Sequence, residues 1–331
     1  MTIALGKWSG TVGVLATGVA LATLLGQIYP SVYTTSATIG IYALIALPLG
    51  LIYGQGGVVS LAQGAFAALG GYTTAILSVQ YGVPPLASLV PAVLLPGLAA
   101  FIIARPILRL PELSLALVTL SLGTVMEVIL QRGGDFTGSF NGLNGIPPLP
   151  VIGNSRMGVH FAIWAVVLLM VVLYVNFLHS MRGRALRAVR VDHLLAQAMG
   201  VRVAFDLSVL FAIAAAVAGL AGWFYAHTIG YIAPDSLSIT LSAYTLFMVV
   251  VGGRKLVLGP IAGAIVFTLA SDLLPGQESH GIFFGIALVL ILMFSPDGLL
   301  TLRPWRRRRK PMPVVASEAA ERAVTVSGGA L

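Results

Sequence analysis

The sequence predicts an all-α polytopic membrane protein with about ten transmembrane helices, in a range of about eight to ten, some of them short or broken. Three observations indicate this class. Hydrophobic residues make up 58% of the 331-residue chain, charged residues make up only 9%, and the mean hydropathy is +0.97. Several apolar runs approach or exceed the roughly 18 to 20 residues that a helix needs to cross a bilayer. The alternating segments of about 10 residues that build outer-membrane barrels are not seen.

Polar residues, prolines and glycines divide the apolar sequence into the predicted spans. These lie near residues 11–29, 38–54, 58–79, 86–104, 113–131, 160–178, 207–230, 237–252, 257–274 and 282–299. The second, third, eighth and ninth are the shortest and the most broken by glycine. The segments GQGG (54–57) and GGRKLVLGP (252–260) are therefore either loops between full spans or turns between half-helices.

The basic residues predict which ends of the spans face the cytoplasm, because cytoplasmic loops are enriched in Lys and Arg. With the N-terminus inside, all but two of the 19 basic residues, Arg132 and Arg156, fall in cytoplasmic segments. This bias favours an even number of spans with both termini in the cytoplasm. Residues 1–302 are expected to form the membrane domain, and the basic segment 303–331 a disordered cytoplasmic tail that contacts anionic lipid.

Missing motifs exclude several other classes of protein. The chain contains no cysteine and its five histidines are far apart in the sequence, so no metal site is expected. Nucleotide-binding glycine loops and the signatures of zinc proteases and serine hydrolases are absent. We therefore expect no enzyme activity and no cofactor bound by this chain. Topology accounts for the net charge of +8, so no nucleic-acid partner is predicted.

Polar side chains inside apolar runs indicate a candidate translocation path, because unpaired polar groups at membrane depth need a partner helix or water. The predicted path residues are Gln55, Ser60, Gln63, Gly64 and Glu127. For Glu127, as for Asp272, the alternative is a structural acid that reaches the membrane interface. For the small residues the alternative is tight helix packing, which is expected for Gly64 with Ala68, Ala67 with Gly71, Ala218 with Gly222, and Gly259 with Gly263.

Five arginines gather in the stretch MRGRALRAVRVDHLLAQAMGVRV (181–203) of a chain that is otherwise nearly uncharged. At about 100° per residue, Arg184, Arg187 and Arg190 share an arc of roughly 120°. A separate arc of about 100° holds the small and apolar residues Ala185, Leu186, Val189 and Ala196. This spacing predicts a short amphipathic helix on the cytoplasmic side, ended by Gly200. It is either a membrane-surface helix or a docking helix whose Ala-rich face fits a groove on a soluble partner.

The predicted outer loop RGGDFTGSFNGLNGIPPLP (132–150) is rich in Gly, Asn and Pro, and long for a connection between two spans. It is either a flexible link or, because turn-forming residues are dense in it, an ordered cap on the outer face.

Four motifs carry a resemblance to a known family: GRALRAVRVDHLLAQAMGV (183–201), AAAVAGLAGWFYAHTIGYIAPDSL (214–237), MVVVGGRKLVLGPIAGA (248–264) and FSPDGLL (294–300). Together they resemble the membrane subunits of branched-chain amino-acid ABC importers, over residues 38–300. The loop motif TGSFNGLNGIP (137–147) and the terminal SPDGLL are more similar to LivM-like subunits than to LivH-like ones. The stretch GGVVSLAQGAF (56–66) departs from the LivM-like pattern at Val58 and Gln63 and is nearer the LivH-like one.

The resemblance implies a multi-pass subunit of an importer in the bacterial inner membrane. Its partners would be a second homologous permease subunit, two cytoplasmic ATPase subunits that use ATP, and a soluble substrate-binding protein. A coupling helix, about 183–200, would sit on an ATPase subunit through Gly183, Arg184, Ala185, Arg187, Ala188, Arg190, Ala196 and Gly200. The binding-protein face would lie near Thr137, Gly138, Gly142 and Gly145.

The resemblance leaves two questions open. The cargo it implies is a branched-chain or related amino acid, with urea or short amides as the alternative. The competing class is a stand-alone channel or ion-coupled carrier in which Glu127 or Asp272 is the coupling group.

Overall fold

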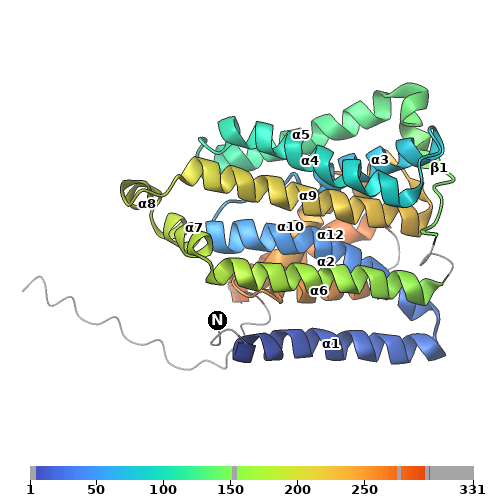
Figure 1. Ribbon diagram of the computed structural model, residues 1–331, viewed down its shortest axis with the longest axis horizontal. Helices are drawn as coiled ribbons and strands as arrows, with labels where there is room; N and C mark the ends of the chain where they lie inside the picture. The colour runs from blue at the N-terminus through green and yellow to red at the C-terminus, as the bar shows by residue number, and fades with distance from the viewer. Residues whose placement is uncertain (1–4, 151–154, 274–276, 295–297, 299–331) are drawn as a thin grey trace, which may run out of the picture. The chain divides into compact units, whose positions relative to one another are not determined.

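A computed structural model gives the structure of residues 5–150, 155–273, 277–294 and 298. These residues are mainly helical, with two short strands and three short 3-10 helices (Figure 1). The long helices are α1 (Leu5–Ile28), α2 (Ser31–Gly56), α3 (Gln63–Val79), α4 (Pro85–Ile107), α5 (Glu112–Arg132), α6 (Arg156–His179), α9 (Val203–Ile229), α10 (Ile239–Gly252), α11 (Gly259–Leu273) and α12 (Gln277–Phe294). The short elements are η1 (Gly134–Phe136), η2 (Ser139–Asn141), β1 (Leu143–Asn144), α7 (Met181–Val191), α8 (His193–Ala198), β2 (Tyr231–Ile232) and η3 (Pro234–Leu237).

Each predicted span overlaps one long helix, and the third begins at Gln63 rather than at residue 58, so the all-α polytopic class is confirmed. Within the described residues, six segments are long and apolar enough to cross a membrane: α2, α4, α5, α6, α9 and the η3–α10 segment Pro234–Gly252. Shorter apolar helices lie within α1, α11 and α12. The number of spans, their sidedness and the division into a domain and a tail stay predictions, and segment 303–331 lies outside the described residues.

A break follows α2, but it lies later than the GQGG motif indicates, because Gly54, Gln55 and Gly56 are the last three residues of the helix. Gly57 adopts a left-handed φ of 74°, and its N–H donates to the Tyr53 carbonyl to end the helix. Residues 57–62 are not helical. Helix α3 then begins in the interior, where the N–H of Gly64 donates to Ser242 Oγ of α10 (2.9 Å). Helices α3 and α10 are short, with 17 and 14 residues, and this contact joins the first turns of both.

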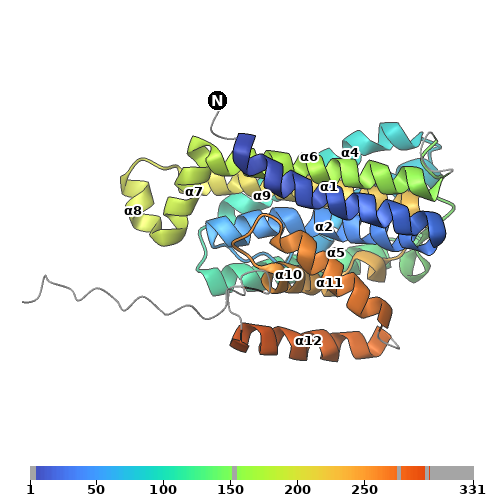
Figure 2. The same ribbon diagram turned by 90° about the horizontal axis from the view of Figure 1, so that it is seen from below.

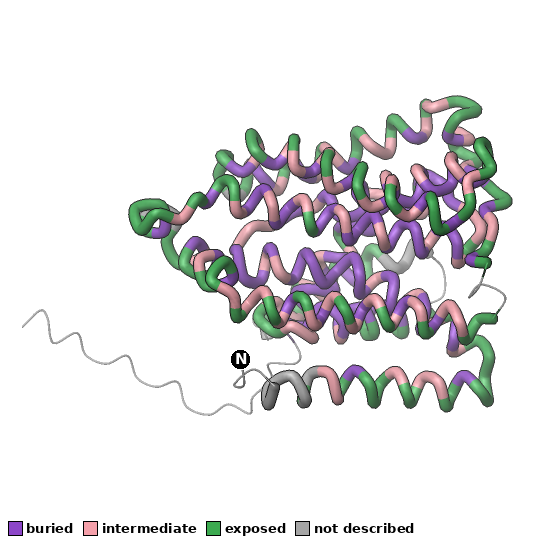
Figure 3. Tube along the Cα trace, viewed as in Figure 1, coloured by how far each residue is buried: buried purple, intermediate pink, exposed green. Residues whose placement is uncertain are grey.

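Small residues bring α9 against α3 and α4, as their four-residue spacing predicts. A Cβ on Gly222 would overlap the Ala67 carbonyl of α3, and one on Gly219 would overlap the Ala92 carbonyl of α4. In the same way, a Cβ on Gly263 of α11 would overlap a backbone carbonyl of α10. Figure 3 shows buried residues along α2 and α9, whereas α1 is mainly exposed or intermediate. The backbones therefore touch at the centre of the helix bundle, as in tightly packed membrane helices.

The two ends of the bundle carry different elements. Helices α7 and α8 lie at one end, and the antiparallel pair β1–β2 lies at the other (Figure 1). The view in Figure 2 places α1 along α6 and α12 beside α10. At the α7 end, Arg190 and Arg254 both meet the last turn of α2. Basic residues from two predicted cytoplasmic loops therefore gather at one end of the bundle.

Candidate functional site

A polar cavity of about 520 Å³ lies toward the β1–β2 end, between α2, α5, η3, α10 and α11. Eleven of its thirteen lining residues carry a hydroxyl or a carboxylate: Thr38, Tyr42, Glu127, Asp235, Ser236, Ser238, Thr240, Tyr244, Thr268, Ser271 and Asp272. Among the described residues, no Lys or Arg lines it. We call it the carboxylate cavity, after Glu127, Asp235 and Asp272.

The three carboxylates come from three separate elements. Glu127 lies near the end of α5, is half-buried, and accepts a hydrogen bond from Gln131 Nε2 (3.3 Å). Asp235 in η3 and Asp272 near the end of α11 are exposed. Groups of this kind attract a cation and accept hydrogen bonds from it. The cavity is therefore suited to a solute that carries a protonated amine.

The wall of the carboxylate cavity also holds polar groups without a protein partner. The hydroxyl oxygens of Thr268 and Ser271 are buried and have no hydrogen-bond partner among the described residues. Buried polar groups are normally satisfied by protein or by water. These two hydroxyls give α11, which is otherwise apolar, a polar face toward the cavity.

The predicted path residues divide into two groups. Glu127 lines the carboxylate cavity, together with Asp272, whereas Gln55, Ser60, Gln63 and Gly64 are buried away from its lining. Gly64 has a packing role, because a Cβ there would overlap the Ser238 carbonyl. Gln63 is only 1% exposed, and neither its amide oxygen nor its amide nitrogen has a partner in the described part of the chain. A role of these four residues in translocation stays a prediction.

The predicted coupling helix is two helices rather than one, which corrects the continuous helix expected over 183–200. It begins at Met181, before Gly183, because Ser180 Oγ accepts from the Gly183 N–H (3.1 Å) and caps α7. It breaks at Asp192, whose Oδ1 accepts from the Leu195 N–H (2.9 Å) and starts α8. Both are ordinary N-terminal caps. Gly200 has a left-handed φ of 87° and follows α8 as predicted.

Glycine at position 183 has a separate structural reason. A Cβ there would overlap the Phe177 carbonyl near the end of α6. The absence of a side chain lets α7 turn closely over the end of α6.

The sequence predicted that the Ala-rich face of this segment would be free to dock, but in α7 and α8 that face is mostly buried. Leu186, Val189 and Ala196 are buried, and Ala185 is half-buried. A groove on a partner therefore cannot take this face, which already packs against the chain's own helices. Arg184, Arg187 and Ala188 are exposed, but Arg190 faces inward, where its Nη1 donates to the Gly54 carbonyl of α2.

The exposed side of α7 and α8 combines charge with apolar surface. Beside the exposed arginines, Val191 is 87% exposed, Leu195 60% and Met199 79%. We call these three residues with Arg184 and Arg187 the docking tip. Large apolar side chains that are this exposed beside basic residues are typical of a surface that contacts a protein partner or membrane lipid.

The predicted outer loop is an ordered cap, as its turn-forming residues indicate. Gly138, Gly142 and Gly145 have left-handed φ values of 73°, 68° and 79°, and Leu143 pairs with Ile232 in the β1–β2 ladder. Thr137 is buried and its hydroxyl donates to the Leu130 carbonyl (2.6 Å). Thr137 therefore holds the cap on α5, and its side chain is not on a surface that a binding protein contacts.

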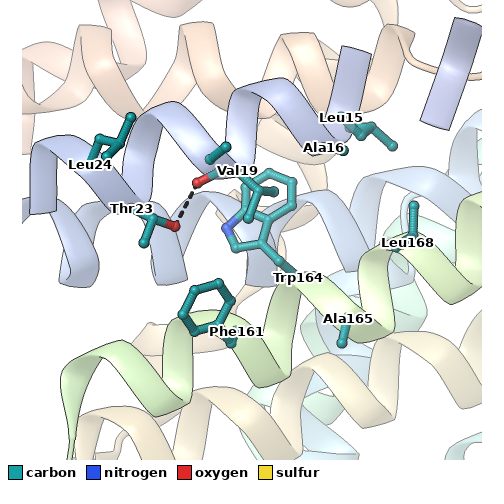
Figure 4. A pocket seen from close by; sticks show the side chains of 10 residues that line it. Leu15, Ala16, Val19, Thr23, Leu24, Phe161, Trp164, Ala165 and Leu168 are labelled. Carbon is teal, nitrogen blue, oxygen red and sulfur yellow. Dashed lines mark hydrogen bonds between the residues drawn. The ribbon is translucent and has the colours of Figure 1, made fainter. Parts of the chain in front are cut away.

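A second cavity, of about 600 Å³, lies between α1 and α6 (Figure 4). Apart from Thr23, its walls are alanine, aliphatic and aromatic side chains, including Phe161, Trp164 and Leu168. The Thr23 hydroxyl beside it donates to the Val19 carbonyl (2.7 Å). This groove offers a polar solute no free partner, so the carboxylate cavity is the better candidate for solute contact.

The sequence pattern missed several residues of the carboxylate cavity. Asp235, Ser236 and Ser238 lie between β2 and α10, at the boundary of two predicted spans, and Thr38 and Tyr42 lie within an apolar run. The segment PDS (234–236) carries a turn pattern that marks a break before α10. Nothing in the local sequence of Thr38 or Tyr42 indicates a cavity.

Comparison with known proteins gives one consistent family. Residues 31–292 match the family described as branched-chain amino acid transport system permease component. The chain is 30% identical over 294 residues to the high-affinity branched-chain amino acid transport system permease protein LivM of Salmonella typhimurium, which covers 79% of this chain and 68% of that protein. The LivM protein of Escherichia coli is 29% identical over 289 residues, with the same coverage.

A LivH protein is also similar to the chain. The LivH permease protein of Escherichia coli is 26% identical over 282 residues, covering 78% of this chain and 91% of that protein. No solved structure matches the chain. The family match spans α2 to α12 and so includes the carboxylate cavity and the docking tip. The chain is a multi-pass membrane protein, and its relatives are permease subunits of transporters. It belongs to the family of branched-chain amino acid transport permease components.

Proposed function

We propose that the chain is a permease subunit of an ATP-driven importer that moves branched-chain or related amino acids across the bacterial inner membrane. The observation that carries this proposal is the docking tip. It exposes Arg184 and Arg187 beside Val191, Leu195 and Met199 at one end of the bundle. A permease without its own nucleotide motif needs a partner that hydrolyses ATP, and an exposed apolar surface with a basic rim suits a soluble partner with acidic groups.

Two cytoplasmic ATPase subunits are the proposed partners at this end. The basic bias of the loops supports a cytoplasmic position for the docking tip. A soluble binding protein is the proposed partner at the opposite end, where the ordered cap exposes Phe140 (71%) near Gly138 and Gly142. ATP is used by the partner subunits.

A second permease subunit is the proposed cover of the carboxylate cavity. Carboxylates on membrane helices are costly when they face lipid. Glu127, Asp235 and Asp272 therefore call for a protein or water on their open side. The LivM and LivH relatives of Escherichia coli are both permease proteins of a high-affinity branched-chain amino acid transport system, which supports a pair of homologous permeases.

The carboxylates also favour one class of cargo. An amino acid carries an ammonium group that the three carboxylates would attract, and its own carboxylate would have to bind away from them, on the hydroxyls of the same lining. Urea and short amides carry no such charge, so they gain less from this lining. The cargo that fits best is therefore an amino acid.

The test is co-purification and uptake. Expressed with candidate ATPase and permease partners, the chain should co-purify with them, and proteoliposomes should take up labelled leucine only when ATP is present. The double variant Arg184→Glu with Arg187→Glu should lose the ATPase subunits, whereas Arg109→Glu, an exposed arginine in another predicted cytoplasmic loop, should keep them. Unchanged co-purification of the double variant would refute the docking tip.

The second candidate function is an ion-coupled carrier, favoured by the single observation that Glu127 and Asp272 share a cavity. In liposomes that contain this chain alone, an ion-coupled carrier would accumulate leucine when an ion gradient is imposed. The importer proposal predicts no accumulation there.

A further inference from the structure

Arg190 lies on the inner side of α7, unlike its neighbours Arg184 and Arg187, which are exposed. Its Nη1 donates to the carbonyl of Gly54 in the last turn of α2. Leu186 of α7 supports the same contact, because a Cβ on Gly56 would lie 3.1 Å from Leu186 Cδ1. Helix α7 therefore rests on the end of α2.

The Gly54 carbonyl is a suitable acceptor for an arginine. The last four carbonyls of a helix have no partner within it, and the negative end of the helix dipole favours a cation. In α2, the N–H groups of Gly57 and Val58 return to the carbonyls of Tyr53 and Ile52. The Gly54 carbonyl is left for Arg190.

The contact lies directly before the break between α2 and α3. A Cβ on Gly57 would lie 3.2 Å from Arg190 Cγ, so the aliphatic part of Arg190 lines the turn itself. A cavity of about 200 Å³ opens beside it, lined by Val58, Leu108 and Leu115 among others. The turn therefore has space into which it can shift.

Beyond the turn, the non-helical segment leads to the helices of the carboxylate cavity. The Leu61 N–H donates to Thr119 Oγ1 of α5 (3.0 Å), and the Gly64 N–H donates to Ser242 Oγ of α10 (2.9 Å). Glu127 on α5 and Tyr244 on α10 line that cavity. A continuous chain of contacts thus connects α7 with the carboxylate cavity at the other end of the bundle.

The other side of the same helix end is held by a second arginine. Arg254, in the turn between α10 and α11, donates from Nη1 to the Tyr53 hydroxyl (2.8 Å). A Cβ on Gly54 would overlap the Arg254 carbonyl. The end of α2 therefore lies between α7 and the α10–α11 turn. When α7 moves, it pushes on a helix end whose opposite side is packed against that turn.

We propose that Arg190 is a positioning residue that transmits a displacement of α7 to the broken α2–α3 segment, and through it to α5 and α10 around the carboxylate cavity. This rests on the proposed function, because an ATPase partner must move α7. Arg184 and Arg187 hold the partner, and Arg190 passes the motion inward. The roles differ because Arg184 and Arg187 lie on the exposed side of α7, whereas Arg190 lies on its inner side.

The first test compares Arg190→Ala with Arg182→Ala in the assembled transporter, reconstituted with its ATPase subunits and binding protein. Arg182→Ala is the matched control, because Arg182 is an exposed arginine of the same helix that lies outside the docking tip. Arg190→Ala should retain ATP hydrolysis, while the amount of leucine imported per ATP falls about fivefold or more. Arg182→Ala should keep the ratio of the unsubstituted protein. Arg190→Lys, which keeps a cation, should give an intermediate ratio.

The second test follows the segment directly. Because the chain contains no cysteine, Val58→Cys and Arg182→Cys can each be labelled singly with a maleimide. A non-hydrolysable ATP analogue should change the labelling rate at both positions when Arg190 is present, and only at position 182 in Arg190→Ala. This readout separates transmission of motion from a general loss of stability.

The outcomes are distinguishable. An unchanged ratio of leucine to ATP in Arg190→Ala, or a position 58 that still responds to the nucleotide in that variant, overturns the role of Arg190. Failure of the transporter with Arg190 intact to import leucine with ATP overturns the proposed function instead.

Discussion

Glu127 of α5 and Asp272 of α11 line the same cavity, although α6 to α10 separate them in the chain. Asp235 joins them from η3. Each carboxylate on its own is compatible with a structural acid near the membrane interface. Their convergence in a cavity that no described Lys or Arg lines gives them a shared electrostatic effect on whatever enters it.

Removing one of these charges should weaken amino-acid uptake. Glu127→Gln and Asp272→Asn keep the shape of the side chain but lose its charge. A hydrogen bond to a charged group contributes ~1.5–3 kcal/mol, so each variant should raise the KM for leucine by about tenfold or more. The measurement is the initial rate of labelled leucine uptake in proteoliposomes over a range of leucine concentrations.

The control for these variants is Asp206→Asn. Asp206 is a half-buried acid in the first turn of α9, away from the ordered cap, and does not line the carboxylate cavity. Its substitution should leave the KM unchanged. An equal rise in all three variants would show that the effect is a general loss of negative charge rather than a contact in the cavity.

The close approach of α9 and α3 makes Gly222 intolerant of a side chain. The Cβ of Gly222→Ala would overlap the Ala67 carbonyl and come within 2.8 Å of the Gly71 nitrogen. Overpacking of this kind costs ~1–3 kcal/mol, so the melting temperature in detergent should fall. Gly285→Ala on α12 is the matched control, because nothing lies within 4 Å of its Cβ and alanine favours a helix. Equal melting temperatures for the two variants would contradict the packing seen at Gly222.

The positions of the helices could be predicted from the sequence, because the length of an apolar run and its Gly and Pro breaks determine where a membrane helix forms. The small-residue pairs also predicted where backbones touch, as Gly222 shows. The cavity could not be predicted in this way. Its lining depends on which helices pack together, and Thr38 and Tyr42 lie in an apolar run that gives no local indication of a polar wall.

The arginine-rich stretch 181–203 shows a different limit. The helical spacing of 100° per residue placed Arg190 on the same side as Arg184 and Arg187, because spacing alone does not distinguish positions within that arc. It does not reveal that the C-terminal carbonyls of α2 lie within reach of Arg190. Likewise, Asp192 is visible as a break in the basic run, but its capping bond to the Leu195 N–H depends on the backbone geometry between α7 and α8.

The cap at Asp192 should control the local stability of α8. In Asp192→Ala the Leu195 N–H loses its acceptor, and loss of an N-cap costs ~0.5–2 kcal/mol of helix stability. The backbone amides of α8 should therefore exchange with deuterium severalfold faster, while those of α9 keep their rates. Asp192→Ser, which retains a capping oxygen, should restore most of the protection. Unaltered exchange in α8 after Asp192→Ala would show that packing of Ala196 alone holds this helix.

The ordered cap offers a pair of glycines that differ in how strictly the fold requires them. Gly142 and Gly145 both have positive φ values, of 68° and 79°, but Gly142 also has a ψ of −167°, a combination that is essentially restricted to glycine and costs another residue ~1–3 kcal/mol. A Cβ on Gly142 would also overlap the Ile232 carbonyl of β2, whereas nothing lies within 4 Å of one on Gly145. Gly142→Ala should therefore lower the melting temperature more than Gly145→Ala and separate β1 from β2. Because the cap is the proposed contact of the binding protein, only Gly142→Ala should also weaken binding-protein-stimulated ATP hydrolysis. If both variants reduce this stimulation equally, the β1–β2 pairing is not what shapes the binding surface.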